Sequence, residues 1–140
     1  MPGPPIRYLT VADVVALHAE VMVRTRDSPK PLVNQGKLES AIMRPQFARQ
    51  YAGADLVRQA ALLGIGISQS QAFENGNKRT AFMAMRTFLY LNGQRFVGDP
   101  LELAKELVAI AEREGSIEEA SDHFTAWLRS QVTARVYRGR

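Results

Sequence analysis

The segment QAFENGNKRTAF, residues 71–82, carries a polar loop directly into one of the most apolar stretches of this chain. It places Lys78 and Arg79 where the pattern predicts the start of a buried helix. A helix N-terminus carries roughly half a positive charge, so each cation there is disfavoured by about 0.3–1 kcal/mol. A bound anion would offset that cost, and the segment therefore predicts an anion site at a helix start.

Apolar residues at helical spacing predict helices along the whole chain. Residues 77–91 are expected to be central, and further helices are predicted at 11–25, 36–43, 55–68, 100–113 and 117–132. Pro45 is expected to end the second helix, because a proline disfavours the helical conformation of the residue before it. Residues 94–98 are expected to be an extended connector. The sequence thus predicts an all-α fold, a single bundle of about six helices around a central buried helix.

Short polar residues mark the predicted helix starts. Thr10 and Ser116 are each followed three residues later by an acidic residue, as in a capping box. Gly93 is expected to end the central helix in a left-handed conformation, and Gly64 and Gly66 are expected to allow close contacts between helices. The predicted N-terminal caps are Thr10, Asp55, Asn77, Asp99 and Ser116.

Length and composition limit the classes of function. The chain has 140 residues, the size of one domain, with an expected core at about 8–130 and a basic tail at 131–140, whose end ARVYRGR (134–140) is expected to be frayed. It has no cysteine, which excludes disulfides, thiolate nucleophiles and cysteine-based zinc sites. No leader and no apolar run of about 20 residues is apparent, so a cytoplasmic location without membrane contact is expected. The net charge of +4 permits a nucleic-acid partner but nothing in the sequence requires one, and none is expected.

The loop before the central helix combines the features of a nucleotide-phosphate site. Gly76 allows a close approach of ligand, Asn77 is the expected cap, and Lys78 and Arg79 supply a point charge and a forked donor. Oxygen ligands for Mg²⁺ are offered by Glu74 and Asn75, and Phe73 is expected to pin the loop to the core. The alternative is an ordinary interhelical loop with two solvated basic residues.

FENGNKRTAF resembles the signature of the Fic/Doc (Fido) family, and specifically of its Doc, death-on-curing, branch. Upstream, LTVADVVALHAEV (9–21) resembles the first helix of the family. GKLESAIMRPQ (36–46) resembles the segment that forms a flap over the target peptide, which places Lys37, Leu38 and Glu39 in that flap. The resemblance covers roughly residues 8–130.

The resemblance implies an enzyme that transfers part of ATP, with Mg²⁺, to a hydroxyl of another protein. Most Fic proteins transfer AMP, whereas Doc phosphorylates a translation elongation factor. Lys78, where Fic enzymes have glycine, favours the phosphoryl-transfer orientation. Phe73, Gly76, Asn77, Lys78 and Arg79 are the residues that the resemblance assigns to the nucleotide.

The resemblance also implies a toxin of a toxin–antitoxin system. The inhibitory motif [ST]-x-x-x-E-[GN] of many Fic proteins is absent, because the residue four positions before Glu114 is Ile110. Inhibition is therefore expected to come from a separate antitoxin, whose acidic or amphipathic segment would suit a basic surface. The alternative function is a Fido-fold interaction module that binds a partner protein and transfers nothing.

One position departs from the family signature. The histidine that acts as base is replaced by Gln71, which cannot accept a proton, and loss of a positioned base costs about 10²–10⁴ in rate. His18 and His123 are expected to lie in distant helices and not to substitute, while Glu74 could serve in principle. The chain could be a natural member that kept only binding, a deliberately disabled variant of a toxic enzyme, or a slow enzyme in which positioning carries the transfer.

Overall fold

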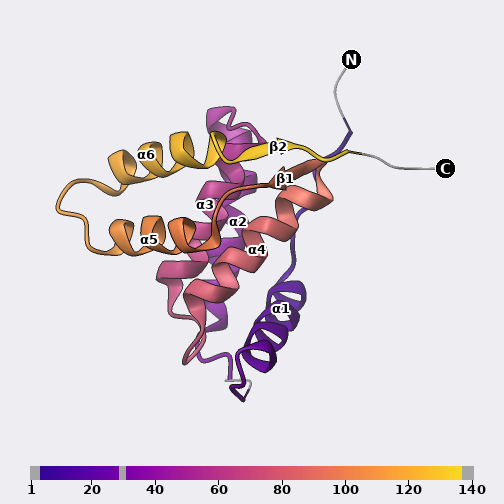
Figure 1. Cartoon of the computed structure of the whole chain (residues 1–140), viewed down its shortest axis with the longest axis vertical. Helices are drawn as coiled ribbons and strands as arrows, with labels where there is room; N and C mark the ends of the chain where they lie inside the picture. Colours follow the sequence, from indigo (N-terminus) through magenta and orange to yellow (C-terminus); the bar gives the residue numbers. More distant parts are fainter. Residues whose placement is uncertain (1–3, 29–30, 137–140) are drawn as a thin grey trace.

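The computed structural model describes residues 4–28 and 31–136 (Figure 1). Six helices and two short strands occur in that part of the chain, and the prediction of an all-α fold is confirmed. In chain order they are α1 (Val11–Arg24), α2 (Gln35–Ala52), α3 (Leu56–Ser70), α4 (Asn77–Leu91), β1 (Gln94–Phe96), α5 (Pro100–Ala111), α6 (Ile117–Arg129) and β2 (Val132–Ala134).

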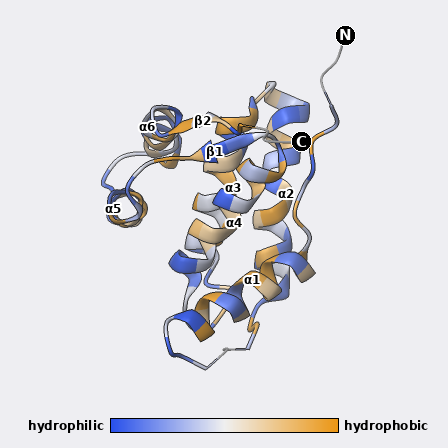
Figure 2. Cartoon of the chain, turned by 45° about the vertical axis from the view of Figure 1, so that its right-hand side comes forward, coloured by the Kyte–Doolittle hydropathy of each residue, from blue (hydrophilic) through white to orange (hydrophobic). Residues whose placement is uncertain are grey.

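The helix at the centre is α3 rather than α4. Ten of the fifteen residues of α3 are buried, against six in α4. Helices α2 and α4 pack along α3, α1 packs against α4, and α5 and α6 lie side by side as a hairpin at one side of the bundle (Figure 1). Figure 2 shows hydrophobic and hydrophilic residues interspersed along the helices. Most of the buried apolar residues form one cluster to which all six helices contribute, and Val21 and Met22 near the end of α1 lie outside it.

The predicted caps are present with one exception, which belongs to the site below. Thr10 forms the complete capping box, since its hydroxyl accepts from the Asp13 N–H at 3.1 Å and the Asp13 carboxylate accepts from the Thr10 N–H at 2.8 Å. The side chain of Ser116 accepts from the N–H of the residue three positions on, at 3.1 Å. Asp55 and Asp99 cap α3 and α5 in the same manner. Local sequence therefore set the helix starts.

Helix α2 does not end before Pro45, and the predicted range of 36–43 is wrong. The helix runs on through Pro45 to Ala52, and its C-cap Gly53 has a φ of 65°, the left-handed conformation common at helix ends. A proline inside a helix costs about 3 kcal/mol. Here Pro45 is buried on the same stripe as Leu38, Ala41 and Ile42, which faces α3, so burial and tertiary packing offset the cost.

Two glycines of α3 make the close helix contacts that were predicted. A Cβ on Gly66 would lie 3.1 Å from the Cβ and 3.3 Å from the Cα of Ala41 in α2. A Cβ on Gly64 would lie 3.1 Å from the sulfur of Met85 in α4. The two glycines thus let α3 approach the helices on both of its sides.

The segment that follows α6 is fixed by backbone pairing over more residues than predicted. The last helix ends at Arg129 rather than near 132, and residues 132–134 form β2, which pairs antiparallel with β1 in the register Phe96↔Val132. The Arg135 N–H donates to the Gly93 carbonyl at 2.8 Å, and its guanidinium lies 4.5 Å from the centre of the Tyr90 ring. The prediction that the segment from residue 134 onward is frayed is therefore wrong for 134 and 135, because backbone pairing with residues 93 and 94 fixes them. The rest of that tail, residues 137–140, lies outside the described residues.

None of the described helices is both long enough and apolar enough to cross a membrane.

Candidate functional site

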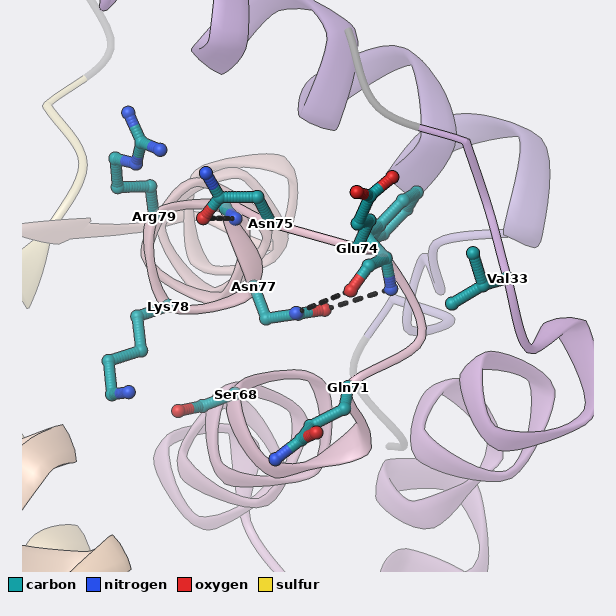
Figure 3. A pocket seen from close by; sticks show the side chains of 10 residues that line it. Val33, Ser68, Gln71, Glu74, Asn75, Asn77, Lys78 and Arg79 are labelled. Atoms are coloured by element: carbon teal, nitrogen blue, oxygen red, sulfur yellow. Dashed lines mark hydrogen bonds between the residues drawn. The ribbon is translucent and has the colours of Figure 1, made fainter.

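The end of α3 and the start of α4 enclose a cavity of about 440 Å³ (Figure 3). All residues assigned to catalysis, nucleotide and metal from the sequence line it, together with two that were not anticipated, Val33 and Ser68. The lining consists of Val33, Ser68, Gln71, Phe73, Glu74, Asn75, Gly76, Asn77, Lys78 and Arg79. The structure thus gathers these residues around one space.

Gly76, not Asn77, is the N-cap of α4, so the predicted cap is displaced by one residue. Gly76 has a φ of 81°, and no side chain caps the helix. Asn77 is instead the first helical residue and braces the loop: its Nδ2 donates to the Phe73 carbonyl at 2.8 Å and its Oδ1 accepts from the Phe73 N–H at 3.1 Å. Because no side chain occupies the helix start, its first N–H groups remain available to an anion from outside.

Gln71 is the C-cap of α3 and has a left-handed backbone, with a φ of 48°. Its side chain is exposed and extends into the cavity (Figure 3). Residues other than glycine are uncommon at positive φ, but histidine is among the types enriched there. The backbone at this position therefore suits the histidine of the family signature.

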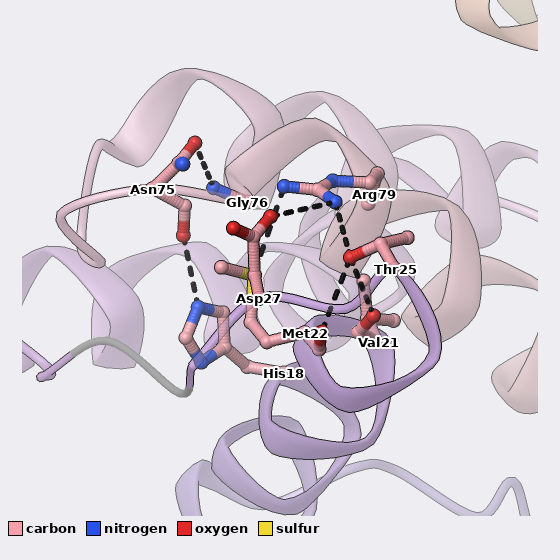
Figure 4. Close-up of polar contacts among 8 residues, drawn as sticks. All are labelled: His18, Val21, Met22, Thr25, Asp27, Asn75, Gly76 and Arg79. Carbon is pink, nitrogen blue, oxygen red and sulfur yellow. Dashed lines mark hydrogen bonds and ion pairs between the residues drawn. The ribbon is translucent and has the colours of Figure 1, made fainter.

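The two predicted phosphate ligands differ in their surroundings. Lys78 is exposed and makes no ion pair with any residue in 4–28 or 31–136. Arg79 is held at the end of α1, where it donates to the Thr25 hydroxyl at 2.5 Å and pairs with the Asp27 carboxylate at 3.6 Å (Figure 4). Lys78 is thus ready to meet a ligand, whereas Arg79 has protein partners that a phosphate must replace or share.

The loop is pinned to the core through Phe73, as predicted. Phe73 is only 2% exposed, and its ring is stacked on the ring of His18, with centroids 3.9 Å apart and an angle of 5° between the planes. The expectation that His18 lies far from the site is wrong. His18 is buried in α1, and its Nε2 lies 2.8 Å from the carbonyl oxygen of Asn75 (Figure 4).

A sequence signal for His18 did exist. His18 shares a helical face with Val14, Val21 and Met22, which are buried, and a buried polar side chain requires a hydrogen-bond partner. What the sequence lacks is the identity of that partner, which lies 57 positions away. The other histidine, His123, is exposed and lies in α6, 3.7 Å from Glu106, so the expectation for it is confirmed.

Glu74 and Asn75 are both exposed at the cavity and offer a carboxylate and an amide oxygen. The side-chain oxygen of Asn75 accepts a hydrogen bond from the Gly76 N–H at 2.7 Å and keeps a second lone pair for another partner. In the described part of the chain no group of three or more acidic or histidine side chains could hold a metal alone. This donor set fits Mg²⁺ that shares its coordination with phosphate oxygens and water, and it does not fit a metal held by protein ligands only.

The three residues assigned to the flap do not border this cavity. They lie in the first turns of α2, where Leu38 is fully buried and Lys37 and Glu39 are exposed. Lys37 lines a neighbouring groove of about 710 Å³ between α2 and α3, together with Arg44 and Phe47. The side chain of Leu38 belongs to the core and is unavailable to a target peptide.

Comparison with known proteins agrees with the signature. The model of the Fic/DOC family matches residues 8–89, more than half of the chain. Toxin Doc of Mycolicibacterium smegmatis is 41% identical over an aligned length of 68 residues, and the match covers 46% of this chain and 51% of that protein. The chain thus spans about half the length of this curated relative. With the motif loop, the uncapped α4 and the helical bundle in place, the family match shows that the chain belongs to the Fic/DOC family.

Proposed function

We propose that the loop between α3 and α4 binds the phosphates of ATP together with Mg²⁺, and that the site is built for transfer of a phosphoryl group to a protein hydroxyl. One observation carries the proposal: a single cavity gathers an uncapped helix N-terminus, Lys78 and Arg79. Without a ligand, the two cations lie at the positive end of a helix and are disfavoured there.

The cavity offers phosphate three kinds of donor. The N–H groups at the start of α4 point out of the helix and favour an anion. Lys78 supplies a compact charge, and the planar guanidinium of Arg79 can donate two parallel hydrogen bonds to phosphate oxygens. Mg²⁺ would be held between the phosphates and the oxygens of Glu74 and Asn75, where it would neutralise phosphate charge.

In the proposed reaction, the oxygen of a target hydroxyl forms a bond to the γ-phosphorus of ATP. The bond from that phosphorus to the bridging oxygen breaks, ADP leaves with the electron pair, and the hydroxyl proton passes to water or to an oxygen of the transferred phosphoryl group. Gln71 lies at the position of the family base and can orient the hydroxyl but cannot take its proton. We therefore propose that transfer by this chain is slow, since phosphoryl transfer depends mainly on positioning and electrostatics but still loses the contribution of the base.

The choice of the γ-phosphate over the α-phosphate rests on Lys78, which stands where AMP-transferring relatives have glycine. Similarity to Toxin Doc supports a Doc-like toxin within a toxin–antitoxin pair. Its partners would be a separate antitoxin and a protein target, with a translation elongation factor as the candidate, and its location would be the cytoplasm.

Isothermal titration calorimetry with ATP and Mg²⁺ tests the binding claim. The folded protein, free of any partner, is expected to bind, and Lys78→Ala is expected to weaken binding by about 10–100-fold, as for the loss of a charged hydrogen bond. Lys105→Ala is the matched control, because Lys105 is an exposed lysine of α5 away from the cavity. Equal weakening by both lysine variants would indicate general charge attraction and contradict the site.

Replacement of the base by Gln71 favours a second candidate, an interaction module that holds a partner protein and transfers nothing. This candidate predicts no heat with ATP and Mg²⁺ at millimolar concentration from protein that is folded by circular dichroism. Such a result would reject the nucleotide site and leave the interaction module as the function.

A further inference from the structure

We propose that His18 is a positioning residue of the site, which sets the orientation of the Asn75–Gly76 peptide unit and so of the Asn75 side chain. This inference rests on the proposed nucleotide–Mg²⁺ site for its consequence in binding. The claim that His18 orients the loop does not depend on that site, because it is argued from the contacts of His18 alone.

The hydrogen bond from His18 has a defined direction. A carbonyl oxygen can only accept, so the Nε2 that lies 2.8 Å from the Asn75 oxygen must carry the proton. The ring is 1% exposed, and a buried polar group without a partner is costly. The bond therefore holds the ring and the loop together with little competition from water.

The Asn75 carbonyl and the Gly76 N–H belong to the same planar peptide unit. His18 donates to the oxygen edge of this plane, while the nitrogen edge donates to the Asn75 side-chain oxygen at 2.7 Å. The three groups form a chain of hydrogen bonds from the imidazole, through the peptide, to the amide (Figure 4). Hydrogen bonds in such a chain reinforce each other, so rotation of the peptide plane would also turn the Asn75 amide oxygen, the proposed metal ligand.

The loop packs closely against α1 at Gly76. A Cβ on Gly76 would lie 2.7 Å from the Met22 sulfur and 3.4 Å from Nε2 of His18. The ring of His18 is also stacked on Phe73, three residues before Gly76. The imidazole thus contacts the loop both before and at the turn into α4, which is the arrangement expected of a group that orients a ligand from outside its coordination sphere.

Two substitutions separate the hydrogen bond from the ring. His18→Leu and His18→Gln both remove the aromatic ring, but only glutamine keeps an N–H donor at about the reach of Nε2. His123→Leu is the control, since His123 is exposed and lies in another part of the bundle.

Amide hydrogen exchange measures the positioning role without any ligand. His18→Leu is expected to speed exchange at Gly76 about 10-fold or more relative to amides in α3, while His18→Gln and His123→Leu exchange like the wild type. Protection at Gly76 that is unchanged in His18→Leu, or lost equally in His18→Gln, would overturn the proposal. Uniformly faster exchange in α3 would also overturn it, because His18 would then only stabilise the fold.

Nucleotide affinity measured with Mg²⁺ and with EDTA tests the consequence at the site. His18→Leu is expected to lower the gain in ATP affinity due to Mg²⁺ by about 10–100-fold, as for other groups that orient a metal ligand, and to leave binding in EDTA unchanged. His18→Gln is expected to restore most of the gain. If His18→Leu binds Mg–ATP like the wild type, the inference is wrong although the site exists. If the wild type binds no nucleotide, the proposed function is wrong, and the hydrogen-exchange result decides the inference.

Discussion

Arg79 has two competing sets of partners. In the structure its guanidinium contacts Thr25, Asp27 and the sulfur of Met22, all from the end of α1 and the turn after it. Phosphate oxygens in the cavity would offer it a stronger partner, since bonds between Arg and phosphate can be bidentate. Asp27 therefore competes with a phosphate ligand for the guanidinium of Arg79.

The substitution Asp27→Asn removes this competition while keeping the size of the side chain. The pair is partly exposed, with Arg79 at 38% and Asp27 at 44%, and such pairs contribute about 0.2–1 kcal/mol. Affinity for ATP with Mg²⁺ is expected to rise by up to about fivefold, measured by calorimetry. Glu20→Gln is the control, because Glu20 is an exposed acidic residue of α1 that pairs with Arg24 instead. Weaker binding by Asp27→Asn would show that Asp27 helps Arg79 to bind rather than restraining it.

The motif residues could be predicted because they are contiguous, and one loop necessarily brings them together. Contacts between residues that lie far apart in the sequence could not be predicted. The role of His18 needed the packing of α1 against the loop, and the partners of Arg79 needed the position of Asp27. Asn77 was assigned a cap by its residue type, but its side chain instead bonds to the backbone of Phe73.

At the scale of elements, the contact of α3 with its neighbours depends on two glycines that are not equivalent. Gly66 faces Ala41, whose Cα and Cβ cannot move without moving α2. Gly64 faces the sulfur of Met85, the adaptable part of a long side chain. A methyl group at position 66 would therefore meet rigid backbone, whereas one at position 64 would meet a side chain that can move.

Gly66→Ala is expected to destabilise the protein by about 1–2 kcal/mol, because overpacking against α2 exceeds the gain in helix propensity. Gly64→Ala is expected to be neutral or to stabilise by up to about 1 kcal/mol, because Met85 can give way. Urea unfolding of both variants measures the difference. Equal effects of the two substitutions would show that the contact of α2 with α3 is not the tight one.

Helix existence was predictable from periodicity, and the extended conformation of residues 94–96 was predicted, but the length of α2, the strand β2 and its pairing with β1 were not. Pro45 was expected to end α2 because a proline restricts the backbone of the residue before it. That local effect does not take account of the burial of this proline against α3. Residues 132–134 continue the apolar pattern of α6, so a short strand there is hard to distinguish from another helical turn. Their pairing with residues 94–96 decides it.

Across the whole molecule, Asp55 joins the start of α3 to the end of α6. Its carboxylate accepts from Arg129 at 2.6 Å and also caps α3 through the Arg58 N–H at 2.9 Å. The hydrogen bond from Arg129 is the main cause that lowers the pKa of Asp55 below its ordinary value of 3.8, and the Arg58 N–H adds to it. The charged form of Asp55 is thus stabilised by folding.

Because the pKa is lower in the folded protein, the contribution of the ion pair is complete above the ordinary value of 3.8 and is lost as the pH falls through the folded value. Asp55→Asn keeps a good cap but removes the charge. At pH 7 it is expected to lower the free energy of unfolding by a few tenths to about 1 kcal/mol, since the pair is half-exposed. Urea unfolding at pH 7 and below pH 3.8 should show this difference shrink on acidification. A difference that grows toward acid pH would contradict this assignment.

The chain belongs to the Fic/DOC family, and one cavity gathers the residues assigned to the nucleotide and the metal, with Gln71 at the position of the base. Restoring the base is therefore the most direct test of the central claim, that this site is made for transfer from ATP. The backbone at Gln71 is in the left-handed region, where histidine is among the favoured types, so Gln71→His should fold without new strain.

The measurement is transfer of label to protein in a cell extract, with ATP labelled at the γ- or the α-phosphate, Mg²⁺, and either the wild type or Gln71→His. We expect Gln71→His to transfer the γ-label to one protein, at a rate about 10²–10⁴ above the wild type. Transfer of the α-label would contradict phosphoryl transfer and indicate AMP transfer instead. If Gln71→His binds nucleotide but transfers neither label, the missing base does not explain the site, and the central claim is wrong.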